Sequence, residues 1–318
     1  MYNCFYCENT EISHKYGVRE MMFGLRETFE YVQCSKCGSI QISNPPADYS
    51  EYYPKDYMAF AFDNVSEIKQ FLKTARFRYS FYGKGLFGKL LQKFRRSPEI
   101  GKFISQTKTN LTDSVLDVGS GEGELLFQMY KIGFSNLTGV DPYICFDKEP
   151  FSGLKFVKNN LSQIKDRFDL IMFNHSLEHV LNPRTELLYA TELLNPGKYI
   201  LVRLPVAGGF AFRKYGTDWI QWDSPRHVSI PTEKGMRVLA ADLGLTVENV
   251  VYESWAFQFW GSEQNMRDIP LHDERSLWLY SKSRIFSKKQ LKQYAIASKK
   301  LNETNDGDMA CFILRKSI

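Results

Sequence analysis

Two short patterns in this sequence carry residue types that can do chemistry. Four cysteines occur as two Cys-x2-Cys pairs near the N-terminus, and residues 115–124 read VLDVGSGEGE, an apolar run broken by three glycines at alternate positions. Thiols at this spacing can hold a metal ion, and glycines at the end of a strand let a ligand approach the backbone closely. The elements that must position both groups follow from the rest of the chain.

The cysteines have the spacing of a tetrahedral site made of four thiolates, which zinc favours. They are Cys4, Cys7, Cys34 and Cys37. Residues 25–34 read as a strand that runs into the second pair, and Gly38 follows where a tight turn favours a residue without a side chain. We predict a zinc ribbon over residues 1–45 with a structural ion, because four thiolates leave no open coordination position. Two disulfides are the alternative, which a reducing compartment disfavours.

Strands and helices alternate from residue 111 to residue 318. Apolar segments of strand length begin at residues 114, 137, 154, 168 and 198, with helical patterns over 125–133, 185–197 and 233–244. Two further strands are predicted over 245–253 and 309–316, which brings the expected number to seven. This order predicts an α/β fold, a doubly wound, Rossmann-like sheet of seven strands, preceded by the ribbon and a helical segment.

The helical segment is expected within residues 46–110, a linker followed by a basic, aromatic-rich stretch over 64–109. Its phenylalanines at helical spacing favour helices that dock on the main domain or form a lid. Contact with a membrane surface, or with an enzyme of glycan assembly, is the second interpretation. The net charge of +5 is only a weak lean toward acidic partners, and nucleic acid is not favoured.

The glycines fall where the first strand of the sheet turns into its helix, at the edge where such folds bind ligands. A pyrophosphate at this place would avoid nearby acids, yet Asp117 precedes the glycines and glutamates lie among them. A ligand with an ammonium and a sulfonium group tolerates these charges, and S-adenosylmethionine is such a ligand. Asp141, about 20 residues further on, is placed to accept hydrogen bonds from both ribose hydroxyls.

Four motifs, VLDVGSGEGELL, GVDP, FDLIMFNHSLEHVLNP and LLNPGKYILVRLP, occur in this order along the chain. In combination they resemble the class I S-adenosylmethionine-dependent methyltransferases, over about residues 111–318. The resemblance implies an enzyme that uses this cofactor. It further implies that the methionine end of the cofactor lies against the loop formed by Asp117, Gly119, Ser120, Gly121 and Gly123.

The same resemblance assigns residues at the ends of the other strands. It implies that Asp141 holds the ribose and that Asn160 and Leu161 lie beside the adenine, where relatives often carry an acid instead of this asparagine. Asn174 and His175, after the fourth strand, would border the sulfonium and the acceptor.

The segment NHSLEHV also places an acid between histidines, as His175-x2-Glu178-His179. This spacing could hold a second metal ion. We favour the other interpretation, in which Glu178 and His179 open a helix, the acid complements the helix dipole and the histidine caps or packs.

Residues 222–232, WDSPRHVSIPT, lie beyond the fifth strand in a region that covers the acceptor in this fold. The ribbon, the methyltransferase domain and this loop together resemble bacterial sugar methyltransferases, whose histidine here serves as a base. His227 is therefore the candidate base, and Arg226 could clamp a phosphate or carboxylate of the acceptor. A purely structural role of His227 stays open, and Trp219 and Trp222 either stack on a sugar or pack in the core.

The resulting hypothesis is methylation of a saccharide hydroxyl in surface-polysaccharide synthesis, with a nucleotide-linked, phosphate-bearing or lipid-linked acceptor. A zinc-ribbon RNA methyltransferase and a non-catalytic scaffold that only binds the cofactor are the alternatives. The first residues lack the pattern of a signal peptide, and no apolar run reaches 18 residues. We therefore expect a cytoplasmic protein, peripheral to the inner face of the membrane if residues 64–109 contact lipid.

Overall fold

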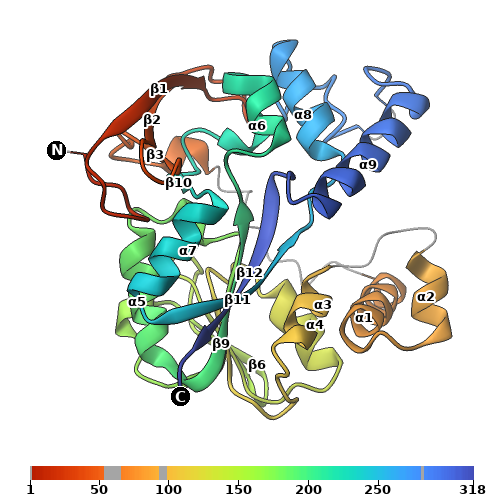
Figure 1. The fold of residues 1–318 in the computed structure, drawn as a ribbon. Coiled ribbons are helices and arrows are strands. Elements are labelled where there is room, and N and C mark those ends of the chain that lie inside the picture. Colours follow the sequence, from red (N-terminus) through yellow and green to blue (C-terminus); the bar gives the residue numbers. More distant parts are fainter. Residues whose placement is uncertain (1, 54–65, 93–98, 281–282) are drawn as a thin grey trace.

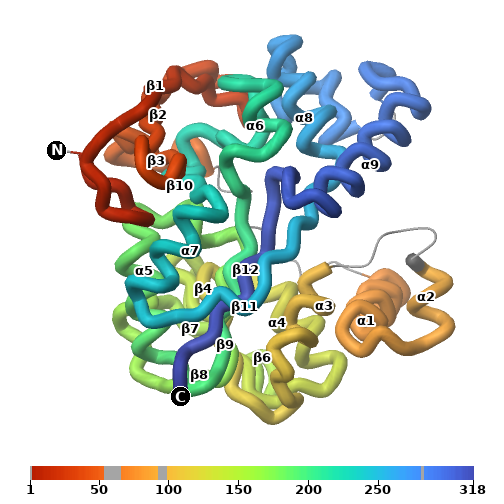
Figure 2. Tube along the Cα trace, viewed as in Figure 1, coloured from red at the N-terminus to blue at the C-terminus, as the bar shows by residue number. Residues whose placement is uncertain are grey.

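The computed structural model describes residues 2–53, 66–92, 99–280 and 283–318 (Figure 1). Within them the chain forms an eight-stranded sheet flanked by helices and a four-stranded sheet near the N-terminus. The tube in Figure 2 shows the small N-terminal sheet next to the blue-green segment that contains β10 and α7. These two parts are neighbours in space although they are far apart in the sequence.

The large sheet has the strand order β11-β12-β9-β8-β4-β5-β7-β6. Its strands are β4 (Val115–Val118), β5 (Leu137–Val140), β6 (Lys148–Phe151), β7 (Leu154–Val157), β8 (Phe168–Asn174), β9 (Leu194–Pro205), β11 (Leu245–Tyr252) and β12 (Met309–Lys316). The seven predicted strands are all present, and β6 is an additional short edge strand antiparallel to β7. The run from β7 to β9 is parallel, so the carboxyl ends of these strands share one edge.

Successive residues of a strand point to opposite sides of the sheet, so the apolar strands present side chains on both faces. Helices cover both faces and bury these side chains. In β4, Leu116 packs with α5 (Pro183–Leu193) and α7 (Glu233–Asp242), whereas the preceding Val115 packs with α3 (Glu99–Gln106) and α4 (Glu124–Lys131). Figure 1 shows these two helix pairs on opposite faces of the sheet. Apolar side chains therefore fill two cores, one on each face.

One predicted helix ends earlier than expected. The sequence predicted a helix over 185–197, but α5 ends at Leu193 and residues from Leu194 belong to β9. Pro196 has no N–H to donate within a helix, and Gly197 adopts a positive φ of 73° that a helix does not allow. The start of α5 follows its sequence, since the Asn182 side chain accepts a hydrogen bond from the Thr185 N–H at 3.1 Å.

The helical segment after the linker contains α1 (Glu67–Tyr82), α2 (Leu86–Gln92) and α3; residues 54–65 and 93–98 of this region lie outside the described residues. Phe77 and α3 are buried against the sheet. Lys73 and Thr74 of α1 bind Glu124 and Gln128 of α4, at 3.1 and 2.9 Å. This segment thus braces the helix that follows the glycine loop.

The small sheet contains β1 (Ile12–Arg19), β2 (Thr28–Cys34) and β3 (Ile40–Ile42), and its fourth strand is β10 (Ser229–Ile230). Beside it lie α6 (Phe210–Tyr215), α8 (Phe257–Met266) and α9 (Lys288–Glu303). Side chains from the small sheet and from residues 207–259 share one aromatic-rich core. The N-terminal module therefore packs on the half of the chain that follows β9.

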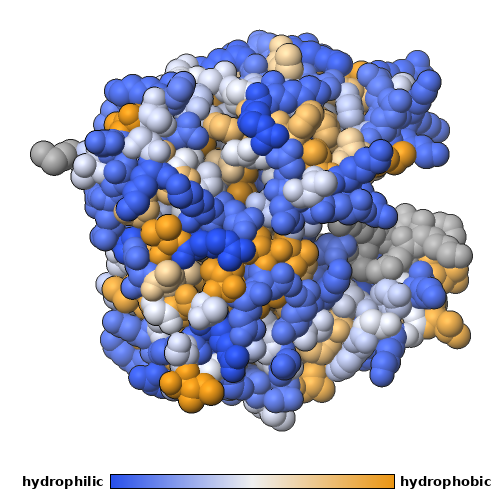
Figure 3. Space-filling model, viewed as in Figure 1, coloured by the Kyte–Doolittle hydropathy of each residue, from blue (hydrophilic) through white to orange (hydrophobic). Residues whose placement is uncertain are grey.

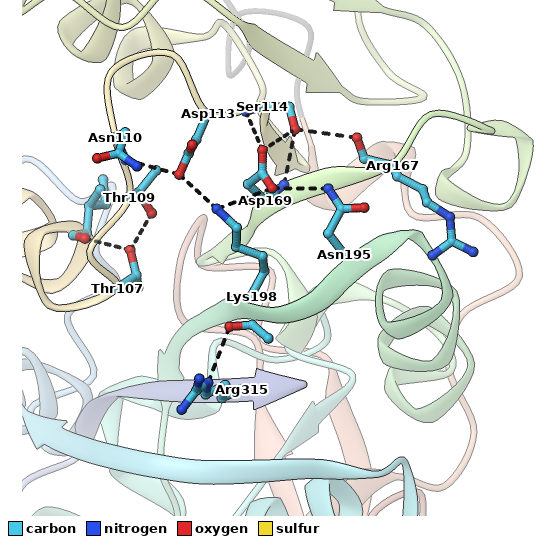
Figure 4. Close-up of polar contacts among 12 residues, drawn as sticks. Thr107, Thr109, Asn110, Asp113, Ser114, Arg167, Asp169, Asn195, Lys198 and Arg315 are labelled. Atoms are coloured by element: carbon cyan, nitrogen blue, oxygen red, sulfur yellow. Dashed lines mark hydrogen bonds and ion pairs between the residues drawn. The ribbon is translucent and has the colours of Figure 1, made fainter. Parts of the chain in front are cut away.

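Asp169 lies at the amino ends of the parallel strands, at the edge opposite the glycine loop. It is the centre of a network of hydrogen bonds and ion pairs (Figure 4). It accepts hydrogen bonds from the backbone N–H and hydroxyl of Ser114 and from the Asn195 amide, each at 3.0 Å. Lys198 lies 3.3 Å from it and 3.1 Å from Asp113. Burial acts to raise the pKa of Asp169, but these donors outweigh it and lower that pKa.

No helix among residues 2–53, 66–92, 99–280 and 283–318 combines the length and the apolar character needed to cross a membrane. Figure 3 shows a face that is mostly hydrophilic, with small hydrophobic patches. Several apolar side chains of α1 and α2 are exposed, including Ile68, Phe71 and Leu86.

Replacing Asp169 by Ala should lower the free energy of unfolding at pH 7 by about 2 kcal/mol, because charged hydrogen bonds are lost and their donors stay partly buried. The folded-state pKa lies below the unfolded value, so this stabilisation is complete above about pH 4 and disappears as the pH falls through the folded-state pKa. Urea denaturation at pH 7 and pH 3 measures both effects. Asp166→Ala is the matched control, since Asp166 is 70% exposed with one ion pair; an equal loss in both variants would contradict the prediction.

Candidate active site

The glycine loop links β4 to α4 at the carboxyl edge of the parallel strands. Gly119, Gly121 and Gly123 have positive φ values of 71°, 49° and 81°, which residues with a side chain rarely adopt. Gly123 immediately precedes α4, so the first N–H groups of that helix open toward the loop. This is the geometry that a ligand-binding loop of a doubly wound sheet requires.

The three glycines differ in what surrounds them. A Cβ on Gly119 would lie 2.5 Å from the Cβ of Ser176, and one on Gly123 would lie 2.1 Å from the Phe156 ring. A Cβ on Gly121 would meet no atom within 4 Å. Two glycines therefore permit close packing, whereas Gly121 faces open space that a ligand can occupy.

Asp117, in β4 just before this loop, is a buried carboxyl group that is 3% exposed. Its Oδ1 atom has no hydrogen-bond partner among the described residues. Burial and the nearby Asp141 raise the pKa of Asp117 to about 8. A desolvated acid without a positive partner fits a cationic ligand, and this observation favours the ammonium and sulfonium groups predicted from the sequence.

Asp141 follows β5 and ties the glycine loop to that strand. Its carboxylate accepts hydrogen bonds from the Gly121 N–H at 2.9 Å and from the Tyr143 N–H at 2.8 Å. The structure thus brings together Asp117, the glycines and Asp141, as the sequence predicted. The ribose contact of Asp141 stays a prediction.

Three further cofactor-binding candidates, Asn160, Leu161 and Ser120, lie at two places. Asn160 is exposed and directly precedes a short 3-10 helix, η3 (Leu161–Gln163), whereas Leu161 is buried in the core. The Ser120 hydroxyl lies within the loop, 2.6 Å from where a Cβ on Gly139 would be. Their contacts with a cofactor stay predictions.

Asn174, at the end of β8, is held by two residues that the sequence analysis missed. Its Oδ1 accepts a hydrogen bond from Arg203 at 3.1 Å, and Arg203 forms a bidentate ion pair with buried Glu253. A charged residue inside the apolar strand 198–205 is the signal that could have revealed this tether.

His175 and Glu178 follow β8, next to the glycine loop. His175 has a positive φ of 59°, and its Nδ1 lies 3.5 Å from Oε1 of Glu178. The prediction that Glu178 and His179 open a helix is wrong, because they are the last two residues of a short 3-10 helix, η4 (Leu177–His179), and α5 begins only at Pro183. Burial acts to raise the pKa of Glu178, but the surrounding histidines His175, His179 and His227 outweigh it and lower that pKa.

His227 comes from the loop before β10 and lies against the same acid. One ligand atom from each of Glu178, His179 and His227 lies within 4.8 Å of the others. The Nδ1 atom of His227 is 2.7 Å from the Gln221 carbonyl, and its Nε2 is 3.6 Å from Asp223. Glu178 was not connected with His227 from the sequence, because 49 positions separate them.

Arg226, the predicted acceptor clamp, is 1% exposed. It forms an ion pair with Asp223 through two nitrogens, and its guanidinium lies 5.3 and 6.0 Å from the ring centres of Phe23 and Tyr53. In this arrangement Arg226 fixes the loop that carries His227. A contact with an acceptor phosphate stays a prediction.

Of the two interpretations of Trp219 and Trp222, the structure favours the core. Trp219 is fully buried and Trp222 is 1% exposed. Their indole N–H groups donate to Asp308 and to the Gly216 carbonyl, at 3.1 and 2.8 Å. Neither ring offers a free face to a sugar.

The four cysteines lie together in the N-terminal module with their sulfurs within 4.8 Å of one another. The Sγ atoms of Cys4 and Cys37 are 3.6 Å apart, and those of Cys7 and Cys34 are 3.5 Å apart, so neither pair is a disulfide. A tetrahedral ion with Zn–S bonds of about 2.3 Å needs sulfurs about 3.8 Å apart. The thiol set and its spacing therefore fit zinc.

This cysteine cluster is directly connected to the loop of His227. The Tyr31 hydroxyl donates to the His227 carbonyl at 2.9 Å, and the Thr232 hydroxyl donates to the Cys37 carbonyl at 2.6 Å. Ser229 and Ile230 form the β10 ladder with β3. The module thus holds the segment from 227 to 232 in place.

Comparison with known proteins is consistent with this site. A family model described as a methyltransferase domain matches residues 86–250, slightly more than half of the 318 residues. The mouse (Mus musculus) protein named EEF1A lysine methyltransferase 2 is 34% identical over 103 residues, which are 32% of this chain and 38% of that protein. The chain therefore spans well under half the length of this relative.

Solved structures with a similar arrangement include the cyclopropane synthase MmaA2 from Mycobacterium tuberculosis, with a TM-score of 0.46 and 14% identity over 80% of this chain and 100% of that chain. A SAM-dependent methyltransferase from Archaeoglobus fulgidus has a TM-score of 0.42 and 20% identity over 73% of this chain and 100% of that chain.

The family match covers the helix before the sheet, the glycine loop, Asp141 and the loop of His227. Together with the buried Asp117 carboxyl group beside an open glycine cradle, it accounts for the acidic side chains at this edge of the sheet. The chain belongs to the methyltransferase domain family, and it is a class I S-adenosylmethionine-dependent methyltransferase.

Proposed function

We propose that this methyltransferase transfers the methyl group of S-adenosylmethionine to a hydroxyl of a saccharide, with His227 as the general base. The acceptor we expect is phosphate-bearing, nucleotide-linked or lipid-linked, as in the synthesis of surface polysaccharides. The proposal rests on the two polar contacts of the His227 imidazole, with the Gln221 carbonyl at Nδ1 and with the Asp223 carboxylate near Nε2.

The Gln221 carbonyl can only accept a hydrogen bond, so the Nδ1 atom of His227 carries the proton and Nε2 keeps a lone pair. Asp223 at 3.6 Å from Nε2 and the buried Glu178 stabilise the imidazolium that forms when Nε2 takes a proton. A neutral hydroxyl is a poor nucleophile near pH 7, and removal of its proton during methyl transfer is the task such a base performs. In the proposed reaction the C–O bond forms as the C–S bond breaks, and the hydroxyl proton passes to Nε2.

The position of this histidine supports a role next to the cofactor. Glu178, whose carboxylate lies within 4.8 Å of a ring nitrogen of His227, is two residues from Ser176, and Ser176 packs on Gly119 of the glycine loop. The Ser176 hydroxyl also donates to the Val118 carbonyl at 2.6 Å. The base and the glycine loop are therefore joined through one short, packed segment.

We also propose that the cysteine cluster binds a structural zinc ion, and that its role is to fix the loop of His227. The contacts from Tyr31, Cys37 and β3 to residues 227–232 support this role. Zinc supplies only cross-linking there, because four thiolates complete its coordination.

The cofactor assignment predicts proton release at Asp117. With its pKa raised to about 8, Asp117 is mostly protonated at pH 7, and a bound cation favours the ionised form. Binding of S-adenosylmethionine at pH 7 should thus release close to one proton and become tighter as the pH rises toward 8. Calorimetric titration in two buffers with different ionisation enthalpies measures this release, and Asp117→Asn should abolish it.

The matched variant for this titration is Asp141→Ala, which should lose most of the affinity because the acid that orients Gly121 and the ribose is removed. Wild-type affinity in Asp141→Ala would overturn the ribose assignment. The absence of cofactor binding by the wild-type protein would instead favour a scaffold.

The role of His227 predicts that His227→Asn lowers kcat by about 10²–10⁴-fold, because Asn keeps a donor for the Gln221 carbonyl but has no basic nitrogen. Affinity for S-adenosylmethionine should stay within twofold of the wild type. His14→Asn, on an exposed strand, is the control. The assay follows methyl transfer to nucleotide sugars and lipid-linked glycans by mass spectrometry; transfer only to a lysine peptide or to RNA would overturn the saccharide proposal.

Removal of zinc with a chelator should speed hydrogen exchange of the amides of residues 227–232, because β10 loses its firm partner strand. The amides of β4 and β8, which pair with each other and not with the small sheet, should exchange as before. Mass-spectrometric hydrogen exchange, with zinc content measured in parallel, tests the proposal. Unchanged exchange in 227–232 after complete zinc loss would show that the cluster does not hold this loop.

A further inference from the structure

Glu178, His179 and His227 form a second group of metal-ligating side chains, separate from the cysteines. Their ligand atoms lie within 4.8 Å of one another, although Glu178 and His227 come from distant parts of the chain. The backbone itself draws the two segments together, since the Val228 N–H donates to the Glu178 carbonyl at 2.8 Å.

Both imidazoles are held in the tautomer with the hydrogen on Nδ1, which leaves the Nε2 lone pair available to a metal ion. The Nδ1 atom of His179 lies 3.0 Å from the Arg226 carbonyl, and that of His227 lies 2.7 Å from the Gln221 carbonyl. A carbonyl only accepts, so each Nδ1 carries a hydrogen and each Nε2 keeps its lone pair. Metal-bound histidines almost always donate their other ring N–H to a carboxylate, a backbone carbonyl or water, and a backbone carbonyl takes this place for both imidazoles here.

The acid of this group is buried and accepts no hydrogen bond among the described residues. Glu178 is 1% exposed, and neither carboxylate oxygen accepts a hydrogen bond from any residue that the structure describes. The nearest side chain that can carry a positive charge is His175, 3.5 Å away. A buried carboxylate in this state gains much from a cation placed between it and two neutral imidazoles.

We propose that Glu178, His179 and His227 bind a divalent transition-metal ion, with zinc as the best match to two imidazoles and one carboxylate. Three protein ligands leave one coordination position open, unlike the closed site of the cysteines. Zinc accepts this mixed nitrogen and oxygen set, whereas magnesium and calcium prefer oxygen ligands alone.

Occupancy of this site has a consequence that rests on the proposed function. The metal takes the Nε2 lone pair of His227, so His227 cannot accept the acceptor's proton while the ion is bound. Zinc at this site therefore inhibits methyl transfer, and the metal-free form is the active one. Inhibition follows from competition for one lone pair and needs no change in the fold.

The test is the zinc content of the full chain. Protein equilibrated with excess Zn²⁺ and freed of unbound metal should hold two ions per chain, and His179→Gln and Glu178→Gln should each hold one. His14→Gln, which alters an exposed histidine, should hold two. Circular dichroism and thermal melting establish that each variant is folded.

One ion in the wild-type chain would overturn the proposal, and so would two ions in both folded variants, because the second ion would then lie elsewhere. Two ions in the wild type with one in either folded variant support it. Titration with Co²⁺ gives a second measurement, since thiolate and imidazole ligands produce different absorption bands, and Glu178→Gln should weaken the second site by at least about tenfold.

Activity separates this inference from the proposed function. If the second ion binds but methyl transfer does not respond to it, the base role of His227 fails while the metal site stands. If methyl transfer depends on His227 but only one ion binds, the metal site fails while the base stands.

Discussion

The pairing of β10 with β3 determines where His227 lies. Only Ser229 and Ile230 of β10 form this ladder, but the preceding Val228 adds one hydrogen bond toward each neighbour. Its carbonyl accepts from the Ile42 N–H at 2.9 Å, and its N–H donates to the Glu178 carbonyl at 2.8 Å. The strand thus spans from the cysteine module to the short helix after β8. Because a strand fixes the direction of its neighbouring side chains, the imidazole has little freedom to leave Glu178.

The two edges of the large sheet use acids in opposite ways. At the amino edge, Asp169 has a donor for each oxygen and a lysine beside it. At the carboxyl edge, Asp117 and Glu178 are at least as well buried but have carboxylate oxygens with no hydrogen-bond partner among the described residues. The first arrangement stabilises the fold, whereas the second leaves carboxyl oxygens whose hydrogen bonds or charge a ligand can satisfy.

The sequence was sufficient to predict the large sheet, because strands such as 168–174 and 309–316 are apolar runs with clear boundaries. It did not reveal β10, which has two residues and no periodicity of its own. The glycine loop and Asp141 could be predicted since their spacing is local. The meeting of Glu178 with His227 could not, because it depends on tertiary packing between segments that no short pattern connects.

One other miss has the same origin. The tether from Arg203 to Asn174 and Glu253 joins residues from distant segments of the chain. For Trp219 and Trp222 the sequence left stacking and packing open, and contact with the neighbouring module decides for packing. The helix predicted to reach residue 197 ends at Leu193 for a local reason, since Pro196 lacks an N–H and Gly197 has a positive φ that a helix does not allow. The tether depends on long-range contacts, whereas the end of this helix was readable from the local sequence.

The shared aromatic core limits how this architecture can change in evolution. Tyr31 of β2 contacts the ring of Trp222 at 5.1 Å between centres, and Phe212 lies against the same indole, so the two halves of that core lie in distant parts of the gene. An N-terminal module of another origin, exchanged for this one by recombination, would have to match those rings and the edge of β10. Exchange of this module alone is therefore constrained by residues 207–230, which share its core.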